Sequence, residues 1–474
     1  TLEEAIALAR RNNPEYLQQS NDGAAADWAV REAYGNLLPG ASVSTGFQYQ
    51  AEGQPRFGLF TGGDLGLGST PSYYYSNYSL GLTYQFSPST ILRVSQARAN
   101  RRATDASIQA ADFSLVAEVT RQYLAVRSAA DGVELARQEL ARARENLKLA
   151  EARVAVGAAI PLDAKQAAVE HGRAEVALIQ AENTLRTEKL RLVERIGIEL
   201  DRDIQLTSDF AIFEPTWDRE QLIAMAMARH PQLLALRAAR EVAQAGVRMA
   251  RGAYLPTVEF GAFWTGSTRE AGNVDALIAN ARQNANDQYQ SCQLLNQVFQ
   301  QLTDPLPTAD CGPLAWNDGM ANAIREQNSA FPFSFTSDPL TAQLRISIPI
   351  FTGFTRQRQV ESARVEAEDA RHRLRAHELR IRTEVSTALQ DLQTAWQTVR
   401  LEERTRELAD EQLNLARERY RVGASSFVEL MEAETQKARA DRSYLNAVYA
   451  FHGGLAALEA AVGQVLRPEE GSQQ

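Results

Sequence analysis

The residues of this chain that could carry covalent or metal chemistry are few. Its two cysteines, Cys292 and Cys311, lie 19 positions apart in a segment rich in Asn, Gln, Asp and Pro. No third or fourth ligand accompanies them, so the pattern disfavours a zinc site. A cysteine pair in such a polar loop is typical of a disulfide formed in an oxidising compartment. Two unrelated free thiols are the alternative.

Enzyme chemistry finds little support. There are five histidines, and His372 and His377 are five positions apart on a predicted helix, so they do not share a face for metal binding. The sequence contains no phosphate-binding loop, nucleophile elbow or Cys-x-x-Cys motif. We therefore predict that the protein is not an enzyme and that it binds no cofactor or metal.

Composition restricts the partners. The 474 residues carry a formal net charge of −9, which argues against nucleic acid because phosphate binding depends on clustered lysine and arginine. No run of 18 apolar residues occurs, so no membrane-spanning helix is predicted, whereas short alternating strands of a transmembrane barrel are not excluded. The chain opens on TLEEAIALA without a basic and apolar leader, so we expect either a cytosolic protein or a signal peptide already removed.

Two glycine-centred segments indicate an internal repeat. Residues 417–429 are RERYRVGASSFVE and residues 151–163 are EARVAVGAAIPLD. Gly157 and Gly423 therefore occupy equivalent places, 266 residues apart, each inside a very long helical pattern. An internal repeat of this length indicates that the fold is built from two similar units.

Landmarks nearer the start of each copy have a shorter offset. REAYGNLLP at 31–39 matches RMARGAYLP at 248–256, an offset of 217. The two offsets differ by 49 residues, which predicts an inserted loop in the second copy between Pro256 and about Arg356. Both cysteines fall inside this insertion.

The repeat suggests the organisation of the whole chain. Each copy has a short helix, two strands, and a long helical hairpin with a glycine at its tip. We predict a first repeat at 1–197, a linker at 198–217, a second repeat at 218–463 and a C-terminal tail at 464–474.

Four segments alternate between apolar and polar residues over about ten positions, the length that a tilted strand needs to cross a bilayer. They lie at 42–50, 77–86, 258–264 and 344–350. Their polar face carries Ser, Gly, Gln, Asn and Thr rather than paired charges, which favours a watered lumen over the half-buried sheet of a soluble protein. Aromatic residues crowd the strand ends, where an interfacial girdle would lie: Tyr73, Tyr74, Tyr75, Phe351 and Phe354.

Two long helical patterns surround the glycines. Roughly 65 proline-free residues precede Gly157, which would span about 100 Å as a helix. Their apolar residues keep a heptad spacing from Val133 to Val154. In the second copy the residues that repeat every seven positions are Leu401, Leu408, Leu415 and Val422. We predict two antiparallel hairpins, with Gly157 and Gly423 in the left-handed conformation at their tips.

The repeat order, the Leu-Pro pairs before the strands (Leu38-Pro39 and Leu255-Pro256) and the two Val-Gly-Ala tips resemble the TolC-like outer-membrane factors, the outer membrane efflux protein family of Gram-negative bacteria. The resemblance covers about residues 1–463. It implies a mainly α protein with a transmembrane β-barrel portion: a homotrimer with four strands per chain in one shared 12-stranded barrel, helices forming a periplasmic tunnel, and an exit duct of a tripartite efflux or secretion system.

The resemblance also implies partners and sites. The tips would dock a periplasmic adaptor, and through it an inner-membrane transporter, using Arg153, Gly157, Ala158, Arg419, Gly423, Ala424 and Ser425. Asp410, Glu411 and Glu418 would contribute carboxylate rings to a closed pore, with solvated helix faces as the alternative. Four strands cannot close a barrel alone, so several chains must share one. A soluble coiled-coil structural or chaperone-like protein, and the periplasmic adaptor itself, are the competing hypotheses.

Overall fold

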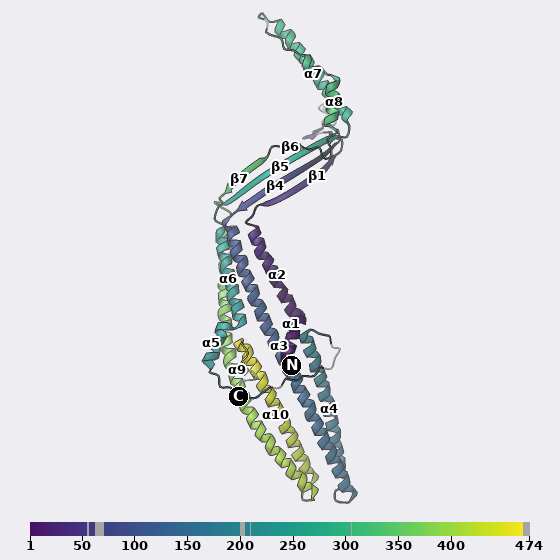
Figure 1. The fold of residues 1–474 in the computed structure, drawn as a ribbon, viewed down its shortest axis with the longest axis vertical. Coiled ribbons are helices and arrows are strands. Elements are labelled where there is room, and N and C mark those ends of the chain that lie inside the picture. The colour runs from purple at the N-terminus through teal and green to yellow at the C-terminus, as the bar shows by residue number, and fades with distance from the viewer. Residues whose placement is uncertain (55, 62–70, 200–203, 209, 305, 468–474) are drawn as a thin grey trace. The chain divides into compact units, whose positions relative to one another are not determined.

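The computed structural model describes the chain except residues 55, 62–70, 200–203, 209, 305 and 468–474, so most of the predicted tail and parts of the linker lie outside the described residues. The protein is mainly helical with some sheet, as predicted (Figure 1). It divides into a helical unit, residues 1–33, 92–252 and 352–474, and a strand unit, residues 34–91 and 253–351. Each unit therefore draws on both sequence repeats.

The described helical unit consists of four long helices and four shorter ones. The shorter helices come before the first strand of each repeat. The long helices are α3 (Pro88–Ala155), α4 (Pro161–Ile196), α9 (Thr355–Arg421) and α10 (Phe427–Val462). The shorter ones are α1 (Leu2–Asn12), α2 (Pro14–Gly35), α5 (Arg219–Arg229) and α6 (Pro231–Gly252). Figure 1 shows α4 beside α3 and α10 beside α9, and each pair forms an antiparallel hairpin. Gln122 of α3 donates a hydrogen bond to Glu188 of α4, while α9 and α10 pack along one another. Within the described residues, no helix is both long and apolar enough to span a membrane.

Two hydrophobic clusters in this unit contain equivalent residues of the two repeats. One is built by α1, α3 and α4, the other by α5, α6, α9 and α10. At the offset of 266, Val119 corresponds to Val385 and Leu192 to Leu458, and all four are at most 1% exposed. These equivalences agree with the duplicated organisation, because residues at equivalent positions of the two repeats are buried in the corresponding clusters.

The glycines that end α4 and α10 show the same relation. Gly197 and Gly463 both adopt a φ of +80°. A Cβ at Gly197 would lie 2.4 Å from the Asn12 carbonyl oxygen, and a Cβ at Gly463 would lie 2.9 Å from the Cα of His230. Both helix ends therefore pack against the junction between the two short helices of their own repeat, at a distance that only glycine allows.

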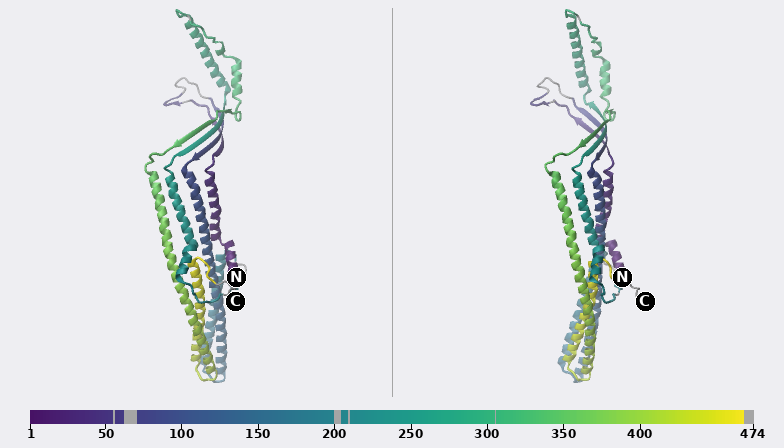
Figure 2. Two further views of the ribbon diagram at one scale, coloured as in Figure 1. Left: turned by 60° about the vertical axis from the view of Figure 1, so that its left-hand side comes forward. Right: turned by 90° about the vertical axis from the view of Figure 1, so that its left-hand side faces the viewer.

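The strand unit holds an antiparallel sheet in the order β1 (Gly40–Gln50), β4 (Tyr73–Phe86), β5 (Thr257–Ala271), followed by β6 (Thr336–Ser337) and β7 (Thr341–Ser347), which both pair with β5. Figure 2 shows the long strands side by side. All four segments with alternating polarity lie largely in β1, β4, β5 and β7. The pairing of β6 and β7 with β5 is interrupted by a one-residue shift around Pro339, which has no amide proton for the ladder. A further two-stranded ladder pairs β2 (Arg56–Phe57) with β3 (Phe60–Thr61).

The prediction that the insertion is a loop was wrong for most of its length. It contains α7 (Val274–Gln300), a 3₁₀ turn η2 (Gly312–Leu314) and α8 (Asp318–Gln327). Partly buried residues recur in α7 every three or four positions, but they are interspersed with Asn and Gln, which obscured the helical period. The predicted disulfide joins Cys292 in α7 to Cys311. The Asn296 side chain reinforces this crosslink through hydrogen bonds to both backbone groups of Ala309.

Candidate functional site

The first hairpin tip is the turn between α3 and α4. The Ala158 amide donates to the Arg153 carbonyl at 2.8 Å, and the Gly157 amide donates to the Val154 carbonyl at 3.0 Å. This helix termination requires a left-handed residue, which Gly157 supplies with a φ of +71°. Pro161 then begins α4 at a position where no amide donor is needed. The tip therefore follows from local sequence.

The second tip, between α9 and α10, repeats this geometry. The Ala424 amide donates to the Arg419 carbonyl at 2.8 Å, and Gly423 has a φ of +81°. Here the next helix begins with a side-chain cap, since the Ser426 hydroxyl accepts a hydrogen bond from the Glu429 amide at 3.3 Å. The predicted left-handed glycines are found at both tips, and Ser426 is the residue that caps α10.

Arg153 links the two tips. Its Nη1 donates to the Tyr420 carbonyl in the last turn of α9, and its Nη2 donates to the Ala158 carbonyl at 3.1 Å. The guanidinium carbon also lies 4.5 Å from the centre of the Tyr420 ring, within cation–π range. Burial raises the pKa of the Tyr420 hydroxyl, which is therefore neutral at physiological pH. Arg153 thus has a structural contact that its sequence position did not indicate, and its predicted part in docking stays a prediction.

The other predicted tip residues remain near the surface. Arg419 pairs with Glu429 at 3.0 Å and so joins the two helices of its own hairpin. Ala158 and Ala424 are exposed, and Ser425 is partly buried. The structure brings both tips together through Arg153, so these residues form one surface within the helical unit.

The tips also expose apolar side chains that the sequence analysis did not assign to the site. Val156 and Val422 directly precede the two glycines and are 78% and 73% exposed. Ile160, Leu162 and Val428 are each more than half exposed. The signal was present in the repeat, since Val156 and Val422 are equivalent at the 266-residue offset. A surface with apolar side chains beside glycines can accept the close approach of another helix.

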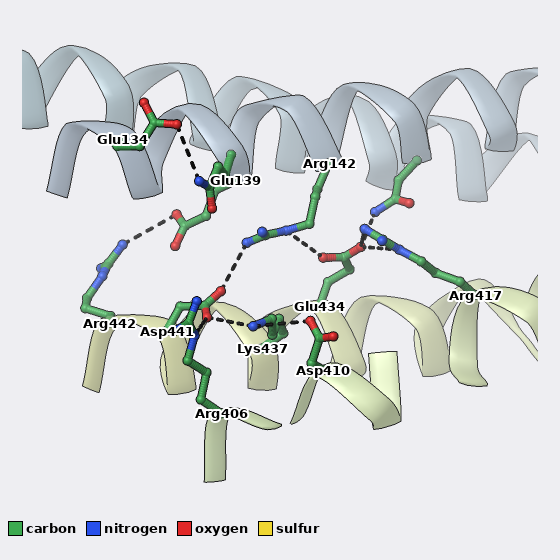
Figure 3. A network of polar contacts seen from close by, with 12 residues as sticks. Glu134, Glu139, Arg142, Arg406, Asp410, Arg417, Glu434, Lys437, Asp441 and Arg442 are labelled. Carbon is green, nitrogen blue, oxygen red and sulfur yellow. Dashed lines mark hydrogen bonds and ion pairs between the residues drawn. The ribbon is translucent and has the colours of Figure 1, made fainter. Parts of the chain in front are cut away.

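A charged layer lies between the two hairpins, further from the tips, and we call it the inter-hairpin network (Figure 3). Asp441 of α10 is its centre and is only 6% exposed. Its carboxylate accepts hydrogen bonds from Lys437 Nζ at 2.7 Å and Arg406 Nε at 3.0 Å. Arg142 of α3 lies 3.6 Å from its other oxygen. Asp441 therefore connects the first hairpin to the second.

Glu434, seven residues before Asp441 in the same helix, forms the second half of the network. It accepts hydrogen bonds from Arg417 Nη2 at 2.7 Å and from Asn146 Nδ2 of α3 at 2.8 Å. Arg142 Nε lies 3.6 Å from its second oxygen, so this one guanidinium spans both carboxylates. Pairing of this kind offsets the cost of burying charge, and removing a single partner would leave that cost uncompensated.

The predicted pore carboxylates lie on α9, and only one of them joins this network. Asp410 is 3.3 Å from Lys437 Nζ, with its own side chain about half exposed. Glu418 forms an exposed pair with Arg421 at 2.7 Å, and Glu411 is exposed. A ring of such carboxylates would need several copies of the chain, so that role stays a prediction.

Glu139 of α3 is the least satisfied member of the layer. Its Oε2 lies 3.6 Å from Arg442, and its Oε1 is buried without a hydrogen-bond partner. Burial raises the pKa of this carboxyl, and neighbouring Arg442 and Arg142 oppose that shift only in part. Among the described residues, no cluster of three or more potential metal ligands occurs. The ion pairs of the inter-hairpin network join helices of the two hairpins.

The fold is similar to that of solved outer-membrane channels. The structure matches CusC with a TM-score of 0.71 at 16% identity, covering 98% of this chain and 92% of that one. It matches the MtrE outer membrane channel of Neisseria gonorrhoeae with a TM-score of 0.70 at 18% identity, covering 98% and 89%. At these identities the likeness establishes the fold.

The sequence comparison identifies the family. The chain belongs to the outer membrane efflux protein family, whose model matches residues 5–197 and 318–464. It is 27% identical over 259 residues to outer membrane protein TolC of Vibrio cholerae, an alignment that covers 54% of this chain. The chain thus spans about half the length of that curated relative, because the alignment covers 56% of it. The family resemblance predicted from the repeats is confirmed, and the family is one of outer membrane efflux proteins rather than of enzymes.

Proposed function

We propose that this protein is the outer-membrane exit duct of a tripartite efflux or secretion system. It would passively conduct substrates from an inner-membrane transporter and its periplasmic adaptor to the exterior of a Gram-negative cell. The observation that carries the proposal is the pair of long helical hairpins combined with an amphipathic sheet, in a chain of the outer membrane efflux protein family. In this arrangement the helices lie in the periplasm and the mature chain has lost its signal peptide.

The duct is a homotrimer with one shared barrel. Among the described strands, β1 pairs only with β4 and β7 only with β5, so each copy has two free edges. Unpaired backbone groups in lipid each cost several kcal/mol, and pairing β1 of one copy with β7 of the next removes that cost. Three copies contribute four strands each, counting β6 and β7 as one interrupted strand, to a 12-stranded barrel.

An apolar stripe on α9 supports the same assembly. The residues of the second copy that repeat every seven positions face away from α10. Their exposed fractions are 68% for Leu401, 59% for Leu408, 66% for Leu415 and 73% for Val422. The seam with α10 uses other positions, among them Leu413 and Tyr420. A heptad stripe that no described residue of its own chain covers fits packing against a second copy.

The adaptor docks at the tips. We expect Gly423→Val to abolish export while the trimer still assembles, because valine penalises the left-handed turn and blocks close approach of a partner helix. Gly157→Val should behave alike, and Arg419→Glu should weaken docking less, since an exposed charge contributes modestly. Gly132→Ala is the matched control, because it changes a glycine within α3 whose Cβ would meet no atom within 4 Å.

The experiment combines mass measurement of the detergent-extracted protein with adaptor binding and export by these variants. A trimer that needs detergent for extraction agrees with the duct. A stable monomer that is extracted without detergent would instead indicate a soluble coiled-coil protein. Tip variants that assemble, bind the adaptor and export normally would show the tips to be simple turns.

A further inference from the structure

The register of the sheet separates an apolar face from a polar one. Tyr78 pairs with Gly266, Leu80 with Trp264 and Tyr84 with Phe260, so these side chains share a face with alternate residues of β1 and β7. Many of them are exposed: Val43, Phe47, Leu80, Trp264, Leu344 and Ile346. In the proposed duct, this apolar face contacts lipid.

In β4 and β5 the apolar face becomes polar beyond Gly266 of β5, whereas β1 keeps Phe47 opposite Ser76. Ser76 of β4 pairs with Thr268, and the next pair on the same face contains Glu270. Ser76 and Thr268 are nevertheless 1% and 6% exposed. Something within the chain therefore covers the polar part of this face.

The cover is an aromatic segment, residues 329–337, with the sequence SAFPFSFTS. Its carbonyl at Pro332 accepts a hydrogen bond from the Ser76 hydroxyl, and its amide at Phe331 donates to Glu270 Oε2 at 3.3 Å. The segment thus satisfies polar groups of the sheet with its own backbone.

Ring contacts hold the segment over the strands. The Phe331 ring centre lies 5.6 Å from that of Tyr74 and 6.3 Å from that of Phe47. Phe335 packs edge-on against Tyr78 at 5.0 Å. The Phe333 side chain touches Phe47 but remains 72% exposed on the outside of the segment. The segment therefore places an exposed apolar side chain over the polar residues of β4 and β5, beside Phe47 of β1.

We propose that the aromatic segment extends the lipid-contacting surface of the sheet and anchors it at the outer boundary of the bilayer, with Phe333 inserted among the lipids. This inference rests on the proposed function, because it takes the apolar face to be the lipid face. A tilted strand crosses the bilayer in about 10 residues. Counted from Thr257, the first residue of β5, the crossing ends near Gly266.

The end of the crossing near Gly266 explains why the residues of β4 and β5 on this face change from apolar to polar there. Beyond Gly266 the strands enter the interfacial region of the bilayer. Aromatic side chains are enriched there because an amphipathic ring can contact both lipid and water. The three tyrosines at the start of β4 do not supply this belt alone. Tyr73 and Tyr75 lie on the polar face, and only Tyr74 shares the apolar one. The segment therefore adds aromatic side chains to those that Phe47, Tyr49 and Tyr74 supply from the strands on this face.

The test uses nitroxide spin labels on the purified oligomer in phosphatidylcholine nanodiscs. The two native cysteines form a disulfide, so Phe333→Cys introduces a single reactive thiol. The matched controls are Leu344→Cys and Gln343→Cys, neighbours in β7 on the apolar and polar faces. Collision of each label with dissolved oxygen and with a water-soluble nickel chelate is measured. All three side chains are exposed, so the substitutions remove little packing.

The expected result is that Phe333 matches Leu344, with a chelate collision rate severalfold below that of Gln343. A label at Phe333 that collides with the chelate as Gln343 does, while Leu344 does not, would overturn the anchor and leave the duct intact. A label shielded from both reagents would also overturn it, in favour of a protein neighbour. Chelate access at Leu344 equal to that at Gln343 would refute the lipid face, and the proposed function with it.

Discussion

Asp441→Asn is expected to release the two hairpins from one another near their tips. The carboxylate of Asp441 is the meeting point of Lys437, Arg406 and Arg142, and it is 6% exposed. Asparagine has nearly the same shape, so the change removes charge rather than volume. Lys437 is itself 7% exposed and would keep only Asp410, at 3.3 Å, as an acidic partner.

The magnitude follows from leaving a buried charge without its counter-charge. Removing one partner of a buried ion pair costs about 3–5 kcal/mol. The half-exposed Asp410 retains part of the pairing, so we expect the lower end of this range, about 3 kcal/mol. Lys437→Met in the same protein should recover part of the loss, because it removes the stranded charge.

Amide hydrogen exchange of the detergent-solubilised protein is the suitable assay, because it measures local opening without requiring reversible unfolding. About 3 kcal/mol corresponds to an increase of roughly 100-fold in exchange for the α10 amides around residue 441. The control is Glu418→Gln, which breaks an exposed pair with Arg421 and should change exchange by less than about fivefold. If Asp441→Asn changed exchange no more than this control, the network would not be holding the hairpins together.

Three further predictions test other parts of the chain. Burial raises the pKa of the Glu139 carboxyl above its ordinary value of 4.5. The contribution of Glu139 to stability therefore falls as the pH rises above 4.5, and it stays lost above the raised pKa. Glu139→Gln should slow amide exchange nearby at pH 7 and leave it unchanged at pH 4. Gly197→Ala should lower the thermal unfolding temperature more than Gly157→Ala, because both incur the left-handed penalty of about 1–2 kcal/mol but only Gly197 contacts backbone; equal shifts would contradict this. Reducing the bond between Cys292 and Cys311 should remove about 3 kcal/mol from the insertion and speed exchange in α7 only; faster exchange in β5 would count against a local role.

Local patterns were sufficient for much of the fold. The glycines at the tips and the strand segments were predicted, because each depends on residues only a few positions apart. The tandem repeat was visible for the same reason, since two copies of one local pattern need no knowledge of their contacts. The cysteine pair was predicted from composition, and the structure forms that bond.

The candidate site was predicted less completely. The docking role of the tip residues stays a prediction, and the sequence did not predict the link from Arg153 to Tyr420 or the network around Asp441. Arg142 and Glu434 are 292 residues apart, and the local sequence around either residue does not predict that they pair. Such pairs form only when the hairpins pack together.

Periodicity has a related limit. The spacing of Leu401 and Leu408 showed that α9 has an apolar stripe, yet the same period describes a stripe that faces α10 and one that faces outward. The alternation in β4 likewise showed two faces, but not that residues 329–337 return to cover one of them. The sequence alone determined which elements form and which of their faces are apolar, because those properties repeat along the chain. Only the tertiary structure decided what covers each face, because that depends on segments brought together from distant parts of the chain.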